Sequence, residues 1–497
     1  MKYIWKFILG ISFSALSISG CNFLNVDVIG KNTIDSYFAD ITSLKPAING
    51  VYNQYYSFYD RYFCLYSESA SDELVFSNTS SPFFIYHNFF STSSDETSAT
   101  GMIWKYGYSV INNANQIIEH IPSLLEKFPN HSAEIKDYLA QAYFMRALTH
   151  FQLCLTYGQN YTYTPDSRHL GVALRLRIPS LTETIARSSV AECYASVIQD
   201  LQTSIAHFSS DLGSSRFFAS KTSARALLAR VYLYMGDWNN AAIYASQVIG
   251  QPELSLTPRS DYVKMYCSSG EMGKEAIFRL GGYKQGTTLS SFYSPVNPSS
   301  RPALKLKALF ENPEDIRGDF SCTLKNTSEG KVSEVTYTNV VYKYTCTDDV
   351  GADTEKKYCN PMILRLSEMY LTRAEAYNHL GRRPDAIEDL KQIMARAVGK
   401  SPSEITIDAS DEASLDELIA VERMKELSFE GHRFFDLTRR HKSIERDEET
   451  TSTVKTLAYP DYRMILAIPH VEIDANRAMW QNPGYTDEYE ETNTIED

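Results

Sequence analysis

A helical hairpin that occurs twice is the feature that most constrains this chain. Between Met362 and Arg440, apolar side chains recur at three- and four-residue steps on two stripes separated by Gly381. Glycine suits the left-handed residue that ends a helix, and Pro384 suits a first helical turn, where no backbone N–H is needed. Ala374 and Ala386 are small enough for the two helices to pack closely, as in a tetratricopeptide repeat. One hairpin cannot bury all of its apolar surface, so we expect partner helices elsewhere.

The same pattern occurs earlier in the chain. Aligning Gly236 with Gly381 gives an offset of 145 residues, and this offset pairs further identical residues: Ala229 with Ala374, Tyr232 with Tyr377, and Ala241 with Ala386. Internal repetition of this kind is typical of stacked helical repeats. Periodicity also predicts helices around Ile111 and Tyr143 and from Val190 to Phe208. We therefore expect a mainly α protein whose helices bury one another.

Charged residues follow the second hairpin. Ser414-Leu415-Asp416-Glu417 predicts a capping box that opens a helix ending at Phe429. The charges after it allow either a catalytic acid cluster or an ion-pair network: Glu422, Arg423, Glu426, Glu430, Arg433 and Asp436. Glu and Arg at helical spacing pair with each other and fix packing, which favours the network. Substitution of Glu426 or Arg433 is then expected to lower stability.

Residues 257–360 have a different texture, rich in Gly, Ser, Pro and Thr with short β-prone runs such as Val335–Tyr344. About 100 residues is too long for a connecting loop, so this segment is expected to be an elaboration of the domain.

Aromatic residues are abundant, with 34 Tyr and 24 Phe against 4 Trp. Five rings gather in a segment rich in Ser, Thr and Asn, which disfavour a helix interior: Phe83, Phe84, Tyr86, Phe89 and Phe90. A flat ring can cover the C–H face of a sugar while a neighbouring polar group takes its hydroxyls. The alternative is that the rings pack beneath their own loops. The clustering favours the binding platform, whose substitution should then affect binding alone.

The N-terminus predicts a secreted lipoprotein. Lys2 and Lys6 precede a twelve-residue apolar run, Phe7–Ile18, which is too short to span a membrane and is typical of a signal peptide. The run ends in Ile18-Ser19-Gly20-Cys21, which resembles a bacterial lipobox. Cys21 would then become the first mature residue and carry acyl chains that hold the protein to a membrane. The alternative is an ordinary signal peptide with an incidental cysteine.

Composition and spacing argue against several other classes. A net charge of −13 and an isoelectric point near 5.4 do not suit a nucleic-acid-binding protein. The histidines and cysteines lack metal-ligand spacing, and the chain has neither a GxSxG elbow nor a phosphate-binding glycine loop. We expect no metal, no cofactor and no catalytic residues. The two acids of a glycosidase can lie far apart in sequence, so hydrolysis stays open.

Taken together, these segments resemble the SusD/RagB family of outer-membrane nutrient-binding lipoproteins. The matching residues occur in the family's order over nearly the whole mature chain: Cys21, Asn49-Gly50-Val51-Tyr52, Ser71-Asp72-Glu73, Trp104 with Asn112–Asn115, Arg146-Ala147, Leu170-Gly171-Val172, Leu366–Ala376, Glu422-Arg423, Glu426-Leu427, Glu430-Gly431-His432-Arg433, Ile468-Pro469 and Gln481-Asn482-Pro483-Gly484-Tyr485. One departure is that Asn22–Val28 carries a single acidic residue, Asp27, where surface-exported lipoproteins often have an acidic cluster.

The resemblance implies a signal peptide over residues 1–20 and one nutrient-binding domain over residues 21–497. The implied fold is a right-handed superhelix of four tetratricopeptide-like helix pairs with loop-rich elaborations and a few short β-strands. The implied function is capture of oligosaccharides, or in some relatives peptides, for a SusC-type TonB-dependent transporter. The protein would be lipid-anchored in the outer membrane and exposed at the cell surface, without catalysis of its own.

The resemblance also suggests where a ligand would lie. The expected ligand-binding residues are the five clustered rings, a facing group and two polar residues: Phe83, Phe84, Tyr86, Phe89 and Phe90; Tyr283, Phe292 and Tyr293; and Asp72 and Arg301. Two other functions are weighed against nutrient binding. A surface glycan hydrolase would require two carboxylates in the aromatic groove, and a tetratricopeptide-type adaptor would require an open helical groove for a protein partner.

Overall fold

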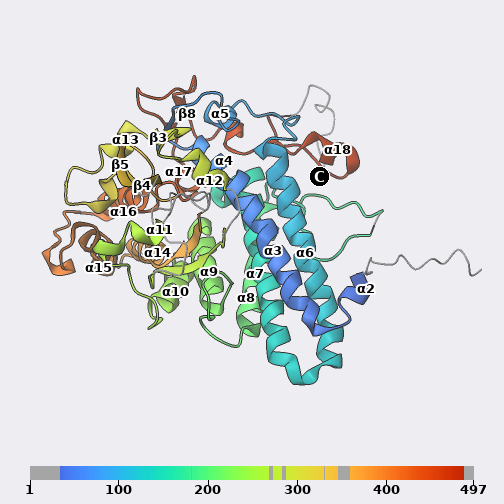
Figure 1. Ribbon diagram of the computed structural model, residues 1–497. Coiled ribbons are helices and arrows are strands. Elements are labelled where there is room, and N and C mark those ends of the chain that lie inside the picture. The colour runs from blue at the N-terminus through green and yellow to red at the C-terminus, as the bar shows by residue number, and fades with distance from the viewer. Residues whose placement is uncertain are drawn as a thin grey trace, which may run out of the picture.

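The computed structural model describes residues 34–180, 182–267, 273–282, 287–328, 331–344 and 359–485. The structure is mainly helical with short paired strands, which confirms the expected fold class (Figure 1). Cys21 and the predicted signal peptide lie outside the described residues.

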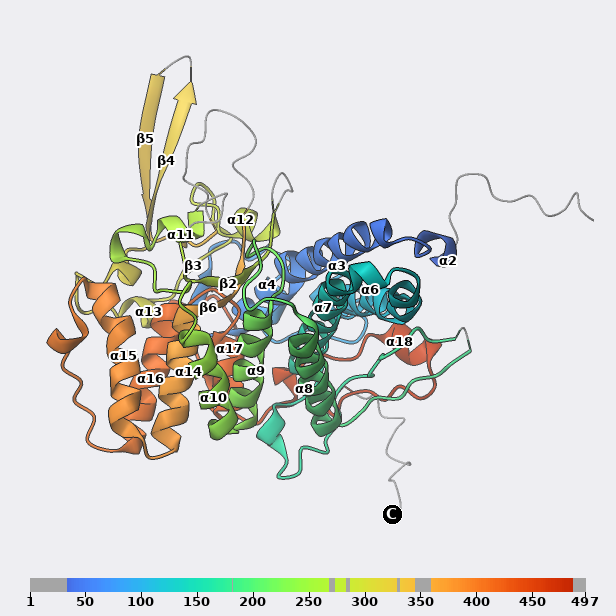
Figure 2. The same cartoon turned by 90° about the horizontal axis from the view of Figure 1, so that it is seen from below.

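The longer helices form a row in which each packs on its neighbour (Figure 2). Along this row lie α6 (Ala99–Lys127), α7 (Ser132–Tyr157), α8 (Val190–His207), α9 (Lys221–Met235), α10 (Trp238–Ile249), α14 (Leu366–His379) and α15 (Arg383–Val398). Helix α3 (Leu44–Phe58) packs on α6 and α7 and runs through a π turn, Tyr59–Phe63, into α4 (Cys64–Ala70). No helix within the described ranges combines the length and apolarity needed to cross a membrane.

The repeated hairpin predicted from sequence is confirmed as α9–α10 and α14–α15. Gly236 and Gly381, which separate the two helices of each pair, have φ values of 73° and 71°, in the left-handed region that favours glycine. The alanines at the repeated positions are fully buried: Ala229, Ala241, Ala374 and Ala386. The right-handed superhelix of four pairs stays a prediction.

The helix after the second hairpin, α16 (Glu412–Leu427), begins earlier than predicted. Asp411 is the N-cap, and its carboxylate accepts a 2.8 Å hydrogen bond from the backbone N–H of Ser414. Ser414 is therefore the third helical residue and completes the capping box from the other side. The helix ends at Leu427, and Phe429 lies beyond it with a φ of 64°.

Short elements complete the fold. The remaining helices are α2 (Ile34–Tyr37), α5 (Phe84–His87), α11 (Lys264–Cys267), α12 (Thr288–Phe292), α13 (Leu304–Lys307), α17 (Arg433–Arg439) and α18 (His470–Ala475). The strands pair antiparallel in twos: β1 (Leu74–Phe76) with β3 (Ser300–Pro302), β2 (Ala276–Arg279) with β6 (Met362–Arg365), β4 (Ser321–Ser328) with β5 (Lys331–Thr338), and β7 (Ile444–Glu445) with β8 (Thr456–Leu457). The β4–β5 hairpin projects from the helical body (Figure 2).

A buried ion network joins α15 and α16 to the elaboration, and Glu426 and Glu430 of the predicted set belong to it. Arg365 contacts three carboxylates, at 2.6 Å from Glu426, 2.8 Å from Glu430 and 3.0 Å from Glu275. Arg396 of α15 contacts Glu426 at 2.5 Å. Burial opposes ionisation of Glu426, but the surrounding guanidinium groups hold its pKa well below the usual range. The network is therefore charged, and each member depends on its partners.

A second buried acidic group lies where the rod formed by α3 and α4 meets the turn after α16. Glu68 accepts a hydrogen bond from the backbone N–H of Gly431, and Glu73 accepts one from that of Phe429. Burial and the neighbouring Glu68–Glu73 contact raise the pKa of Glu68, and burial raises that of Glu73 to about 6. The Glu68–Glu73 pair therefore stabilises the fold only while it holds a proton.

Removing the charge of one carboxylate in the ion network should destabilise the fold. We expect Glu426→Gln to lower the free energy of unfolding by about 3–5 kcal/mol, because buried Arg365 and Arg396 lose their shared partner. Urea unfolding measures this. Asp261→Asn, which removes a half-exposed carboxylate 3.5 Å from Lys264, should change it by less than about 1 kcal/mol. Equal effects of the two substitutions would contradict the structural role of the network.

The stability contributed by the Glu68–Glu73 pair should fall as pH rises. The pKa of Glu73 is raised in the folded state, so its contribution to stability is complete below the unfolded value of about 4.3 and is lost as pH rises through about 6. Glu73→Gln removes this ionisation, so the variant should lose less stability between pH 5 and 8 than the parent. Urea unfolding across that range tests this, with exposed Glu311→Gln as the control. Parallel pH profiles of Glu73→Gln and the parent would refute the assignment.

Candidate functional site

The predicted ring platform is largely part of the hydrophobic core, which corrects the sequence-based expectation. Phe83, Tyr86 and Phe89 are buried, and Phe84 is half-buried against the same core. Tyr86 donates a hydrogen bond to Ser98, and the Arg446 guanidinium lies 4.9 Å from the centre of the Phe89 ring. In this segment Phe90 is the exposed ring, at 57%. Four of the five rings therefore stabilise their own loop, as in the alternative considered above.

The facing group is also mostly interior. Phe292 packs edge-on against Phe83, with ring centres 5.9 Å apart. Tyr293 is fully buried and stacks on Tyr344 at 5.3 Å. Tyr283 lies outside the described residues. Substitution of the buried rings would thus lower stability, contrary to the expected effect on binding alone.

The two polar candidates differ from each other. Asp72 is buried and paired with Arg433 and Lys305 at 2.7 Å each. Burial opposes its ionisation, but these two cations lower the pKa of Asp72 to about 2, so it is a structural anion. Arg301 pairs with Val75 across the β1–β3 ladder, and its buried Nε has no hydrogen-bond partner among the described residues. Among the described members of the set, Arg301 and Phe90 could still meet a ligand.

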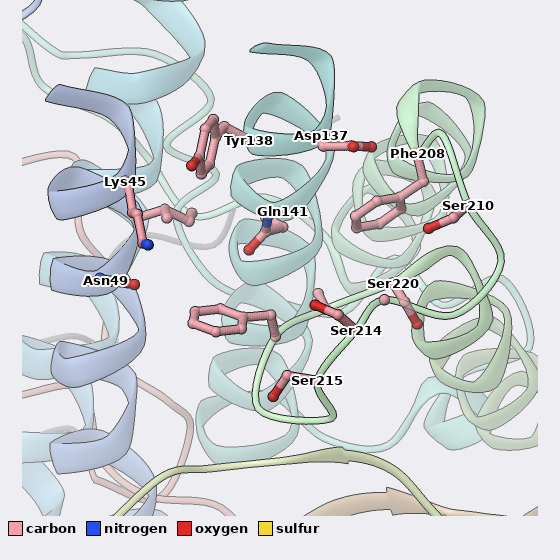
Figure 3. A pocket seen from close by; sticks show the side chains of 14 residues that line it. Lys45, Asn49, Asp137, Tyr138, Gln141, Phe208, Ser210, Ser214, Ser215 and Ser220 are labelled. Atoms are coloured by element: carbon pink, nitrogen blue, oxygen red, sulfur yellow. The ribbon is translucent and has the colours of Figure 1, made fainter. Parts of the chain in front are cut away.

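A pocket of about 220 Å³ lies between α3, α7 and the connection from α8 to α9 (Figure 3). Lys45 and Asn49 of α3 form one wall. The opposite wall comes from α7 and the connection, residues 208–220. Apart from Gly213 and Ala219, its side chains are polar or aromatic: Asp137, Tyr138, Gln141, Phe208, Ser210, Ser214, Ser215, Phe218 and Ser220. We call this hollow the α3–α7 pocket.

Hydrogen bonds hold the connection against the two helices. At its start, Ser209 donates to both oxygens of Asp137, at 2.8 Å from the backbone N–H and 2.7 Å from Oγ. At its end, the backbone N–H of Ala219 donates to Oη of Tyr52, which in turn donates to Gln141 at 3.0 Å. These contacts fix both ends of the connection, so the α3–α7 pocket is preformed.

The α3–α7 pocket presents an accessible phenylalanine ring, Phe218, among hydrogen-bonding groups. Phe218 is 38% exposed and packs edge-on against Tyr52 at 5.3 Å, which orients its ring. Burial and the carboxylates of Glu134 and Asp137 raise the pKa of Tyr138, so its hydroxyl stays protonated and can donate. Lys45 and Asp137 balance in charge. This combination suits a neutral polar ligand with an apolar face, such as a sugar unit.

Sequence reasoning missed this pocket, although a signal was present. The connection reads Ser-Ser-Asp-Leu-Gly-Ser-Ser-Arg-Phe-Phe over residues 209–218, which is the same mixture of small polar residues and rings that suggested the Phe83–Phe90 platform. The connection lies between two predicted helices and looks like a simple linker. The pocket could not be predicted from it because the other wall comes from α3, far away in sequence.

Comparison with known proteins shows similarity to one family. A family model described as the SusD family matches residues 311–485, and one described as "Starch-binding associating with outer membrane" matches residues 30–233. Over these two ranges the chain is similar to proteins of the SusD type. The curated SusD-like protein P2 of Formosa agariphila is 26% identical, over 95% of this chain and 98% of the relative. SusD-like protein P38 of the same organism is also 26% identical, over 70% and 74% of the two chains.

Solved structures agree with this similarity. A Bacteroides vulgatus protein named for sugar binding has a TM-score of 0.76 at 25% identity, covering 90% of this chain and 99% of that one. A SusD superfamily protein from Bacteroides thetaiotaomicron has a TM-score of 0.74 at 25% identity, covering 89% and 99%. The SusD fold thus accounts for nearly the whole described chain.

The corrected placement of the rings predicts different effects at two of them. We expect Tyr293→Ala to lower the free energy of unfolding by about 3–5 kcal/mol, since it leaves a cavity in the core. Phe90→Ala, at an exposed ring, should change it by less than about 0.5 kcal/mol. Urea unfolding of the two variants measures the difference. A neutral effect of Tyr293→Ala would show that this ring is not part of the core.

Proposed function

We propose that this protein is a lipid-anchored nutrient-binding protein of the outer membrane. It captures oligosaccharides at the cell surface and delivers them to a partner TonB-dependent transporter of the SusC type. In this proposal residues 1–20 are the signal peptide, Cys21 carries the lipid, and residues 21–497 form the binding domain. The protein performs no chemistry on its ligand.

The observation that carries this proposal is the match along nearly the whole chain to the SusD family. The matching family model over residues 30–233 is described by starch binding and association with the outer membrane. The Bacteroides vulgatus relative in structure is named for sugar binding. These properties are carried over to this chain as part of the proposal.

The α3–α7 pocket supplies a place for the ligand. Its volume of about 220 Å³ is below the roughly 300–1,000 Å³ of sites that enclose a drug-sized molecule. It would therefore hold one unit of a longer glycan, with the Phe218 ring against the sugar face. Asn49, Gln141 and Tyr138 are placed to exchange hydrogen bonds with its hydroxyls.

Hydrolysis is less well supported by the geometry. Glycosidases use two carboxylates on either side of the scissile bond. Among the described residues that line the α3–α7 pocket, Asp137 is the one carboxylate, and Ser209 donates to both of its oxygens. Binding without turnover therefore suits the site better.

The protein-adaptor function is also disfavoured. An adaptor would need an open face along the helix row, whereas Arg439 of α17 lies against both α9 and α14. Arg439 of α17 contacts Glu375 of α14 at 2.6 Å, and its guanidinium lies 5.5 Å from the centre of the Tyr234 ring of α9. Helix α17 therefore occupies part of the space beside α9 and α14.

The proposal is tested by binding measurements on the purified full chain. Isothermal titration with neutral glucan, xylan, mannan and galactan oligosaccharides, and with short peptides, should give saturable binding to one glycan class. Phe218→Ala should weaken that binding about tenfold by removing the stacking ring, while urea unfolding stays nearly unchanged.

Phe90→Ala is the matched control, since it removes an exposed ring from the segment first expected to bind. Loss of binding in Phe90→Ala with none in Phe218→Ala would place the ligand on that segment instead. Binding of peptides alone would refute the oligosaccharide assignment, and turnover of a glycan would refute the non-catalytic function.

A further inference from the structure

A second, larger hollow lies at the C-terminal end of α17. It has a volume of about 450 Å³ and is formed by α13, α16, α17 and the segment that leads into β7. Nine of its lining residues are charged, six basic and three acidic: Lys305, Arg423, Arg433, Arg439, Arg440 and Lys442, and Glu417, Asp436 and Glu445. The chain as a whole carries a charge of −13, so this local excess of cations is a distinct feature. We call it the basic hollow.

Carboxylates behind the lining hold these cations in place. Asp72, with a fully buried side chain, pairs with Lys305 and Arg433. Glu375, also buried, accepts both terminal nitrogens of Arg439, at 2.6 and 2.8 Å. Lys305, Arg433 and Arg439 are thus held by partners that do not line the basic hollow, so a ligand would lose less side-chain entropy when it binds them.

Some donors in the lining have no partner. Arg423 is 2% exposed and uses Nε and Nη2 on Asp436, at 3.2 and 3.1 Å. Its Nη1 is buried and has no hydrogen-bond partner among the described residues. Arg433 likewise uses Nε and Nη2 on Asp72, which leaves its Nη1 without a bond to a described residue. A buried guanidinium nitrogen without an acceptor is costly, so an acceptor from outside is favoured.

We propose that the basic hollow binds an oxyanion group of a ligand, either a carboxylate or a sulfate ester. Such a group brings several acceptor oxygens, and guanidinium groups recognise it through charge-assisted hydrogen bonds. Nη1 of Arg423 and Nη1 of Arg433 donate to it, and Lys442, whose side chain is 52% exposed and lies 2.8 Å from Glu417, adds a cation at the rim. Neutral sugars lack the charge that this donor set requires.

An adjoining hollow of about 260 Å³ provides room for the rest of such a ligand. It shares five lining residues with the basic hollow: Glu417, Arg439, Arg440, His441 and Lys442. Its far side includes Trp238, whose ring stacks on His379 at 4.1 Å and is thereby fixed in orientation. An acidic sugar can place its oxyanion on Arg423 and its uncharged neighbours toward Trp238.

The site is tested with small anions, so the result does not depend on binding at the α3–α7 pocket. The full chain is titrated with sodium glucuronate, sodium sulfate and glucose at constant ionic strength, and binding is followed by ligand-observed NMR. At least one anion should saturate with a Kd in the millimolar range, and glucose should not. Glucuronate alone indicates a carboxylate site, and sulfate alone a sulfate-ester site. No saturable response to either anion overturns the proposal.

Variants locate the binding. Arg423→Lys keeps the charge but loses the fork that reaches both Asp436 and the ligand, and should weaken anion binding about tenfold. Lys442→Gln, at the half-exposed rim, should weaken it a few-fold without affecting folding. Lys264→Gln removes the same charge away from the hollow and should have no effect. If Lys442→Gln and a folded Arg423→Lys bind anions like the parent, or if Lys264→Gln weakens binding equally, the proposal is wrong.

Discussion

The buried charge of Arg365 is the interaction on which the rest of the structure depends. Its guanidinium contacts Glu275, Glu426 and Glu430, which come from the elaboration, from α16 and from the turn after it. A charge taken out of water is tolerated only while its partners stay in place. The helix row and the elaboration therefore cannot unfold independently of each other, and together they form a rigid frame. The hollows lie on that frame at connections between helices, where the chain is free to vary.

The sequence sufficed for features whose cause is local. The repeated hairpin could be predicted because Gly236 and Gly381 end helices by their own backbone preference, and because small residues recur at helical spacing. The spacing of Glu and Arg was enough to predict that an ion network exists. It could not predict which residues pair, since Arg365 and Glu430 are 65 residues apart. The start of α16 was misplaced because Asp411 and Ser414 both carry capping side chains.

The candidate site could not be predicted in the same way. Ring clusters look alike in sequence whether they bind a ligand or fill a core, and tertiary packing decides between the two. Phe83 is buried because Phe292 packs on it, while Phe218 stays accessible beyond Tyr52. The α3–α7 pocket depends on the bond from Ala219 to Tyr52, across 167 residues. No local pattern encodes such a contact.

The turn after α16 couples two groups of opposite pH dependence. Glu430 belongs to the ion network and has its pKa lowered against burial by Arg365 and Lys343, so its contribution to stability is lost in acid. On either side of it, the backbone N–H groups of Phe429 and Gly431 bind Glu73 and Glu68, whose contribution is lost as the pair ionises with rising pH. One short turn thus joins the rod formed by α3 and α4 to the ion network. The frame is therefore most stable at mildly acidic pH, where Glu430 is ionised and the Glu68–Glu73 pair still holds a proton.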